Sequence, residues 1–106
     1  METSAAIKDL AEKLSTDEWI DLIGSSLVER SFLGDLPLPG APSAVLQAAF
    51  VGSSGRDSMR EAGLFYRYAL DVNQRYRGAA IGRLLDFGCG WGRYTRLLAR
   101  DVPVVH

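Results

Sequence analysis

The chain has 106 residues, a hydrophobic fraction of 47% and a net charge of −1, with 12 basic and 13 acidic side chains. This length allows one domain at most, and the near-neutral charge gives no indication of binding to nucleic acid or to an anionic membrane. The single cysteine excludes an intramolecular disulfide and a cysteine-based metal cluster. No stretch approaches the roughly 20 apolar residues of a membrane span or resembles a secretory signal, so we expect a cytoplasmic protein without a membrane partner.

Two amphipathic helices are predicted at the start of the chain. The first runs from Thr3 to Leu14, because apolar residues recur there at helical spacing. The second begins near Asp17, since Ser15 and Glu18 have the spacing of a capping box, although Thr16 is an equally plausible cap. Its inward residues are predicted to be Trp19, Ile20, Ile23 and Leu27, and its middle is weakened by Gly24, Ser25 and Ser26.

Glycine and proline are too frequent between residues 31 and 43 for either a helix or a strand, so this segment is the predicted linker. Ser43 is then the predicted cap of a short helix that reaches Phe50. Gly52 and Gly55 end that helix.

A long helix is predicted from about Asp57 to Tyr76. The apolar residues that share one face of it are Met59, Ala62, Phe65, Tyr66, Ala69, Val72 and Tyr76, which predicts a core stripe. The opposite side carries Arg56, Arg60, Arg67, Asp71 and Gln74. This row is either a site for an acidic substrate or a solvated face, and we favour the solvated face because Asp71 dilutes the positive charge.

The segment from Leu84 to Arg100 reads as a strand, a glycine loop and a helix. Gly88, Gly90 and Gly92 alternate with two other residues before a helix whose apolar stripe holds Tyr94, Leu97 and Leu98. Three alternating glycines exceed what a tight turn requires, and the positive end of a helix follows them. The segment therefore predicts a loop that binds a ligand through its backbone.

The spacing of the glycines restricts the ligand. A Walker loop needs Lys followed by Ser or Thr after its last glycine, and Arg93 and Tyr94 stand there instead. The dinucleotide fingerprint is G-x-G-x-x-G, and Arg93 occupies the place of its third glycine. A nicotinamide dinucleotide is therefore the weaker alternative.

The heptapeptide DFGCGWG, residues 86–92, resembles the first motif of class I S-adenosylmethionine-dependent methyltransferases, an acidic residue followed by any residue and G-x-G-x-G. The resemblance implies an α/β fold with a Rossmann-like sheet. It also implies that Gly88, Gly90 and Gly92 let the methionine part of S-adenosyl-L-methionine lie against the loop, with Asp86 near its ammonium group. A carboxylate is attracted by an ammonium and a sulfonium, whereas a pyrophosphate would repel it.

The predicted cofactor site comprises Asp86, Gly88, Cys89, Gly90, Gly92 and Arg93. Cys89 is interpreted as a small filler of the loop, because no base is placed to activate it as a nucleophile. Arg93 either meets the cofactor carboxylate or faces water, and Trp91 either shields the cofactor or packs. His106, the single histidine, is at the end of an incomplete strand, which argues against a role as general base. The catalytic residues are not predicted.

Val102, Val104 and Val105 predict the start of a second strand. In doubly wound folds an acidic residue holds the ribose about 20 residues past the glycines, so we expect a truncated chain. Residues 1–50 are then a helical extension, and residues 51–106 begin the Rossmann-like domain. The predicted function is methyl transfer to an unidentified small-molecule acceptor by the complete protein, with no turnover by this chain alone. The alternatives are a fragment of an NAD-dependent oxidoreductase and a non-enzymatic helical interaction module.

Overall fold

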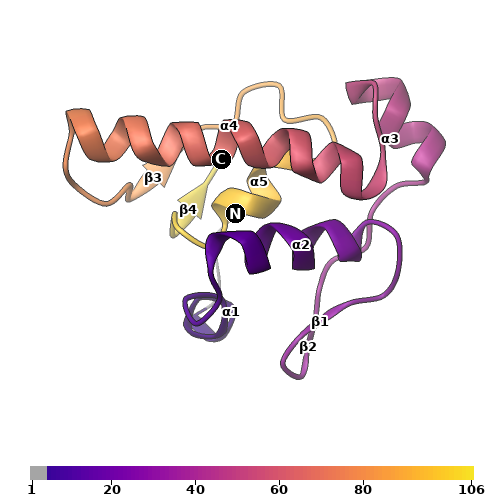
Figure 1. The fold of residues 1–106 in the computed structure, drawn as a ribbon, viewed down its shortest axis with the longest axis horizontal. Helices are drawn as coiled ribbons and strands as arrows, with labels where there is room; N and C mark the ends of the chain where they lie inside the picture. The colour runs from indigo at the N-terminus through magenta and orange to yellow at the C-terminus, as the bar shows by residue number, and fades with distance from the viewer. Residues whose placement is uncertain (1–4) are drawn as a thin grey trace.

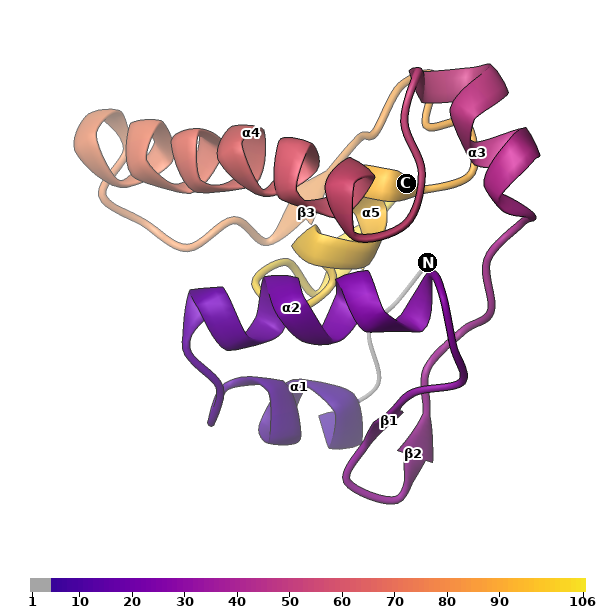
Figure 2. The same cartoon turned by 45° about the vertical axis from the view of Figure 1, so that its right-hand side comes forward.

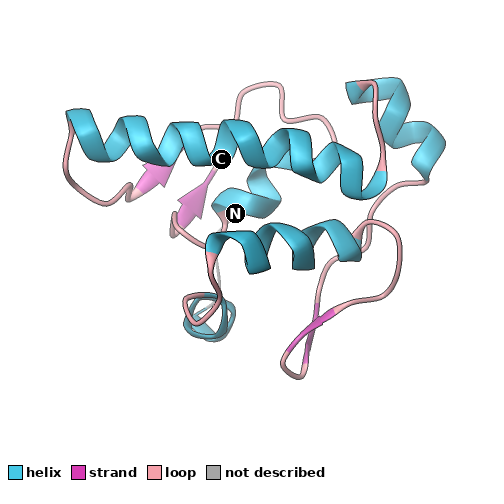
Figure 3. Ribbon diagram, viewed as in Figure 1, coloured by secondary structure: helices cyan, strands magenta, loops and turns pink. Residues whose placement is uncertain are grey.

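The computed structural model describes residues 5–106, which form helices together with a few very short strands (Figure 1). In chain order the elements are α1 (Ala5–Ala11), α2 (Thr16–Ser26), β1 (Phe32–Leu33), β2 (Leu36–Pro37), α3 (Ala44–Val51), α4 (Gly55–Tyr76), β3 (Arg83–Leu84), α5 (Arg93–Leu98) and β4 (Val104–Val105). Helix α5 lies between α2 and α4 in both Figure 1 and Figure 2. The strands form two separate pairs, as the colouring in Figure 3 makes clear.

The start of α2 confirms the predicted capping box. The Ser15 hydroxyl accepts from the Glu18 amide at 3.1 Å, and a Glu18 carboxylate oxygen accepts from the Ser15 amide at 2.9 Å. These bonds, the one from the Ser15 backbone above all, lower the pKa of the Glu18 carboxyl. The helix also runs unbroken through Gly24 to Ser26, where the sequence indicated weakness. Packing explains this continuity, because Gly24 lies against α4, where a Cβ would be 3.6 Å from Cβ of Met59.

The core is built between α2, α4 and α5. Its largest fully buried apolar side chains are Trp19, Tyr66, Met59, Leu97 and Val102. Helices α2 and α4 approach closely at Gly63, where a Cβ would lie only 3.0 Å from Cδ1 of Ile20. Because Trp19 and Leu97 belong to one cluster, residues from both predicted units share this core. The division of the chain after residue 50 stays a prediction.

The predicted stripe on α4 is confirmed in part, since Ala69 and Val72 are half-buried and two of its aromatic members are exposed. Met59, Ala62 and Tyr66 are buried, but Phe65 is 53% exposed and Tyr76 is 83% exposed. The C-terminal end of α4 extends past α2 in Figure 1, so fewer elements cover it. Periodicity therefore identified an apolar face, whereas the covering of that face depends on where the neighbouring helices end.

Other boundaries differ from the sequence predictions in smaller ways. Helix α1 ends at Ala11 rather than Leu14, and the predicted start at Thr3 lies outside the described residues. The segment predicted to lack strands holds the antiparallel pair β1–β2, in which Leu33 faces Leu36 across a turn at Gly34. Burial of Leu33 anchors this pair despite the neighbouring prolines. The predicted cap of α3 is confirmed, since the Ser43 hydroxyl accepts from the Leu46 amide at 3.3 Å.

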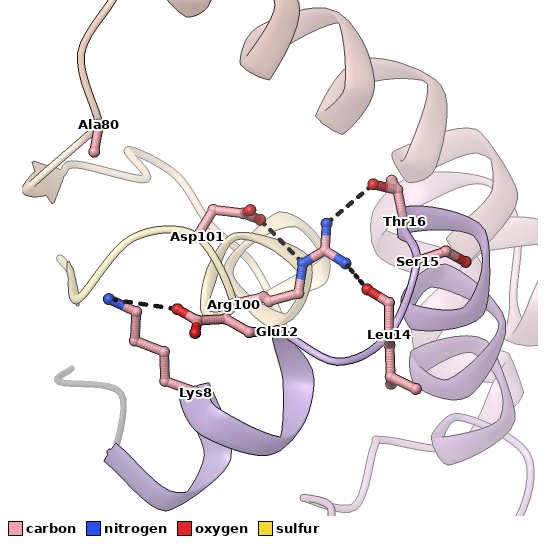
Figure 4. A pocket seen from close by; sticks show the side chains of 8 residues that line it. All are labelled: Lys8, Glu12, Leu14, Ser15, Thr16, Ala80, Arg100 and Asp101. Carbon is pink, nitrogen blue, oxygen red and sulfur yellow. Dashed lines mark hydrogen bonds and ion pairs between the residues drawn. The ribbon is translucent and has the colours of Figure 1, made fainter.

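A polar network joins the end of α5 to the connection between α1 and α2 (Figure 4). The guanidinium of Arg100, a residue only 9% exposed, donates to the Leu14 carbonyl at 3.3 Å and to the Thr16 hydroxyl at 3.1 Å. Its Nε lies 3.6 Å from a carboxylate oxygen of Asp101, which also accepts from the Tyr66 hydroxyl. Burial, reinforced by this bond to Asp101, raises the pKa of Tyr66 well above its ordinary value.

Replacing Tyr66 with Phe is expected to lower the free energy of unfolding by about 1 kcal/mol or more, because it removes a hydrogen bond to a charged group. Since the folded-state pKa of Tyr66 lies above its usual value of 10.0, the Tyr66 contribution is fully present below pH 10 and is lost as the pH rises further. Urea unfolding at neutral and alkaline pH measures both effects.

The matched control is Tyr68→Phe, since Tyr68 is 65% exposed. It should leave stability and its pH dependence unchanged. An equally steep alkaline loss of stability in Tyr66→Phe and in the unsubstituted chain would contradict the role given to Tyr66.

Candidate functional site

The candidate site lies on a strand–loop–helix–strand unit formed by β3, α5 and β4. The two strands are parallel, with Arg83 facing Val104 and Leu84 facing Val105. The ladder continues beyond the short strands, because the His106 amide donates to the Leu84 carbonyl at 2.8 Å and the Asp86 amide donates to the His106 carbonyl at 2.7 Å. Within residues 5–106 this sheet has two strands, so the larger Rossmann-like sheet stays a prediction.

All three loop glycines have backbone angles that side-chained residues rarely adopt. The φ angles are +68° at Gly88, +57° at Gly90 and +84° at Gly92. A Cβ added at Gly88 or Gly90 would meet no atom within 4 Å. These two glycines are therefore required by the loop conformation rather than by internal packing, and the outer side of the loop is accessible.

Asp86 stands where β3 enters the loop. One of its carboxylate oxygens accepts from the Thr95 hydroxyl at 2.7 Å, and its side chain is half-buried. The other carboxylate oxygen forms no hydrogen bond within the described part of the chain. Helix α5 thus orients this carboxylate and leaves one oxygen for a ligand.

Arg93 points away from the loop. Its side chain is 13% exposed, and one terminal nitrogen lies 3.3 Å from the Glu61 carboxylate and 3.4 Å from the Ser58 carbonyl. The other terminal nitrogen donates to the Tyr94 hydroxyl at 2.9 Å. Arg93 therefore links α5 to α4 rather than facing water, and its contact with a cofactor carboxylate stays a prediction.

Two further loop residues differ in burial: Cys89 faces outward, whereas Trp91 packs against the core. Cys89 is exposed, and its thiol lies 3.7 Å from the Gly90 carbonyl, so it fills no internal space. Trp91 packs against the core with the Arg96 guanidinium 5.5 Å from its ring centre. The indole nitrogen is buried without a hydrogen-bond partner among residues 5–106. This placement favours packing over shielding as the role of Trp91.

A shallow hollow of about 360 Å³ adjoins Asp86. The other residues that line it are apolar or aromatic: Phe65, Ala69, Ile81, Leu84, Leu85, Phe87, Tyr94 and Leu98. The rings of Phe65 and Tyr94 are 5.1 Å apart and tilted at 60°, so they form part of one wall. The sequence pattern did not indicate this hollow, because Phe65 belongs to the predicted core stripe of α4 and Tyr94 to the predicted apolar stripe of α5.

The basic row on α4 is paired with acids of this chain. Arg67 contacts Asp17, and Arg75 lies 3.1 Å from Asp71. Arg56 and Arg60 likewise meet Glu29 and Asp57 at 3.6 and 3.3 Å. These pairs are largely exposed and favour a solvated face over a substrate site.

The remaining candidates give no second site. His106 is exposed, and its backbone completes the ladder with β3. The part of the chain that the structure describes holds no group of three or more His, Cys, Asp or Glu residues able to bind a metal ion. Nor does it contain a helix long and apolar enough to cross a membrane.

Comparisons with family models, curated proteins and solved structures found no match.

Substituting Arg93 with Ala is expected to lower the free energy of unfolding by about 1 kcal/mol or more, because it removes a largely buried guanidinium that bonds to α4 and to the Tyr94 hydroxyl. Chemical denaturation measures the change. The control is Arg75→Ala, whose ion pair with Asp71 is exposed and should contribute about 0.5 kcal/mol or less. Equal effects of the two substitutions would contradict the structural role of Arg93.

Proposed function

We propose that this chain supplies the first S-adenosyl-L-methionine-binding loop of a methyltransferase with a Rossmann-like domain, acting on a small-molecule acceptor. The observation that carries the proposal is the loop between β3 and α5, where three alternating glycines have positive φ angles directly after Asp86. Ligands of parallel α/β sheets bind beyond the carboxyl ends of the strands, which is where this loop lies.

The residues present are compatible with that cofactor. The accessible backbone at Gly88 and Gly90 allows a ligand to approach without meeting a side chain. The free oxygen of Asp86 suits an ammonium group, and the apolar lining of the adjoining hollow suits uncharged parts of a ligand. Charge and space at the loop thus support a cationic amino-acid cofactor.

S-adenosyl-L-methionine carries an activated methyl group on its sulfonium. The contribution of this chain would be to bind and orient, since aligning reactants can supply several kcal/mol of catalysis. Asp86, held by Thr95, would fix the ammonium end, and the glycine backbone would fix the chain between ammonium and sulfonium. No described side chain is assigned as a general base.

The arrangement gives less support to a nicotinamide dinucleotide. Arg93 takes the place of the third glycine of that fingerprint, and its side chain is held by α4 rather than being free to meet a pyrophosphate. The Asp86 carboxylate would also repel a pyrophosphate at this loop. The charges and side chains at this loop therefore suit S-adenosyl-L-methionine better than a nicotinamide dinucleotide.

Isothermal titration of the 106-residue chain with S-adenosyl-L-methionine tests the proposal, and we expect saturable binding that exceeds binding of NAD. Gly90→Val should abolish that binding, because a β-branched side chain is strained at positive φ and would occupy the accessible surface of the loop. Gly82→Ala is the matched control, since Gly82 precedes β3 in open space without a positive φ angle.

Asp86→Asn should weaken binding of S-adenosyl-L-methionine by about tenfold or more, because it removes the charge that meets the ammonium. The amide oxygen can still accept from Thr95, so circular dichroism should show an unchanged fold. Unchanged affinity in Asp86→Asn, or tighter binding of NAD than of S-adenosyl-L-methionine, would overturn the proposal.

A further inference from the structure

The hollow beside Asp86 lies where α4, the end of β3 and α5 meet, and several of the apolar side chains around it are in contact with solvent. Phe65 is 53% exposed, Leu85 is 69% exposed and Phe87 is 92% exposed. Exposed apolar groups that line one concave surface are typical of ligand-binding grooves. The volume of about 360 Å³ is that of a site for a small molecule.

Two of the side chains that line this hollow carry polar groups. Asp86 keeps one carboxylate oxygen without a hydrogen bond in the described part of the chain. The Tyr94 hydroxyl accepts from Arg93, so its own proton is left for a ligand. No basic side chain lines the hollow, and the Arg93 guanidinium is paired with Glu61 on α4. A negatively charged ligand would therefore meet the Asp86 carboxylate without a compensating positive charge.

The adenosine part of the proposed cofactor is a poor match for the hollow. Adenosine carries an amino group, ring nitrogens and ribose hydroxyls, and each of them needs a hydrogen-bond partner when it leaves water. Once the cofactor ammonium occupies Asp86, the Tyr94 hydroxyl is the one polar side-chain group of the lining that stays available. The hollow thus suits a ligand with fewer polar groups than adenosine.

We propose that this hollow binds the methyl acceptor, and that the acceptor is an uncharged aromatic molecule. The inference rests on the proposed function, in which the ammonium of S-adenosyl-L-methionine meets Asp86 at the border of the hollow. The tilted rings of Phe65 and Tyr94 form a wall on which a further ring packs in an offset or edge-to-face arrangement. An oxygen on that ring accepts from the Tyr94 hydroxyl, and the other lining residues exclude water from its apolar part.

Isothermal titration with 2-naphthol, an uncharged aromatic probe with one hydroxyl, tests this inference. Saturable binding is expected both without S-adenosyl-L-methionine and with a saturating concentration of it, because the two ligands occupy neighbouring places. Naphthalene-2-sulfonate has the same rings and a negative charge. Without the cofactor it should bind at least about tenfold more weakly than 2-naphthol, since the Asp86 carboxylate repels it.

Two variants on α4 test whether the probe binds in the hollow. Ala69→Phe fills the hollow and should weaken binding of 2-naphthol by about tenfold or more, with the affinity for S-adenosyl-L-methionine unchanged. Its matched control is Ala49→Phe, at an exposed alanine of α3 outside the hollow. Phe65→Ala removes part of the wall and should also weaken the probe, whereas Tyr68→Ala, at a residue 65% exposed and outside the lining, should not. Circular dichroism checks that each variant is folded.

Displacement of 2-naphthol by S-adenosyl-L-methionine would assign the hollow to the cofactor and overturn the inference. Equal affinity for the sulfonate, or equal losses in the hollow variants and their controls, would overturn it as well. If the chain binds S-adenosyl-L-methionine but not 2-naphthol, the inference fails and the proposed function stands. If it binds 2-naphthol but not S-adenosyl-L-methionine, the proposed function fails, and the assignment of the hollow to a methyl acceptor fails with it.

Discussion

The indole of Trp19 donates a hydrogen bond of 2.9 Å to the carbonyl of Leu97, inside the core and across 78 positions of the sequence. Both residues are almost completely buried, so we expect loss of this hydrogen bond to lower the free energy of unfolding by about 1 kcal/mol. This bond fixes α5 against α2. Because α5 follows the glycine loop and leads into β4, the position of the loop depends on the same contact.

The first turn of α5 extends this constraint to the candidate site. Arg93 ties it to α4, and Thr95 holds the carboxylate of Asp86 at the end of β3. The two ends of the loop are therefore anchored, while a Cβ added at Gly88 or Gly90 between them would meet no atom within 4 Å. A rigidly held loop with an accessible backbone is the arrangement that backbone recognition of a ligand requires.

Local signals predicted the parts of this fold that depend on neighbours in sequence. The cap of α2 at Ser15, the cap of α3 at Ser43 and the long helix α4 all follow from residues within one or two turns. The positive φ angles at the loop glycines were likewise implied by residue type. These features could be predicted from the sequence because helix propensity and capping act over a few neighbouring residues.

Contacts between distant segments were not predictable in the same way. Arg93 meets Glu61, 32 residues earlier, and Arg100 meets Leu14, 86 residues earlier, and nothing in the local pattern specifies either partner. The contact of Phe65 with Tyr94, 29 residues later, is likewise not specified by the local pattern. The hollow beside Asp86 was missed for this reason, since its walls come from α4, β3 and α5 together.

Titration of the ¹⁵N-labelled chain with S-adenosyl-L-methionine, followed by amide NMR, addresses the central claim at the level of single residues. The account predicts saturable shifts of the Gly88, Gly90 and Gly92 amides, with Gly40 and Gly82 unmoved because they lie outside the loop. Absence of shifts at the three loop glycines at saturating cofactor, or shifts confined to other parts of the chain, would contradict it.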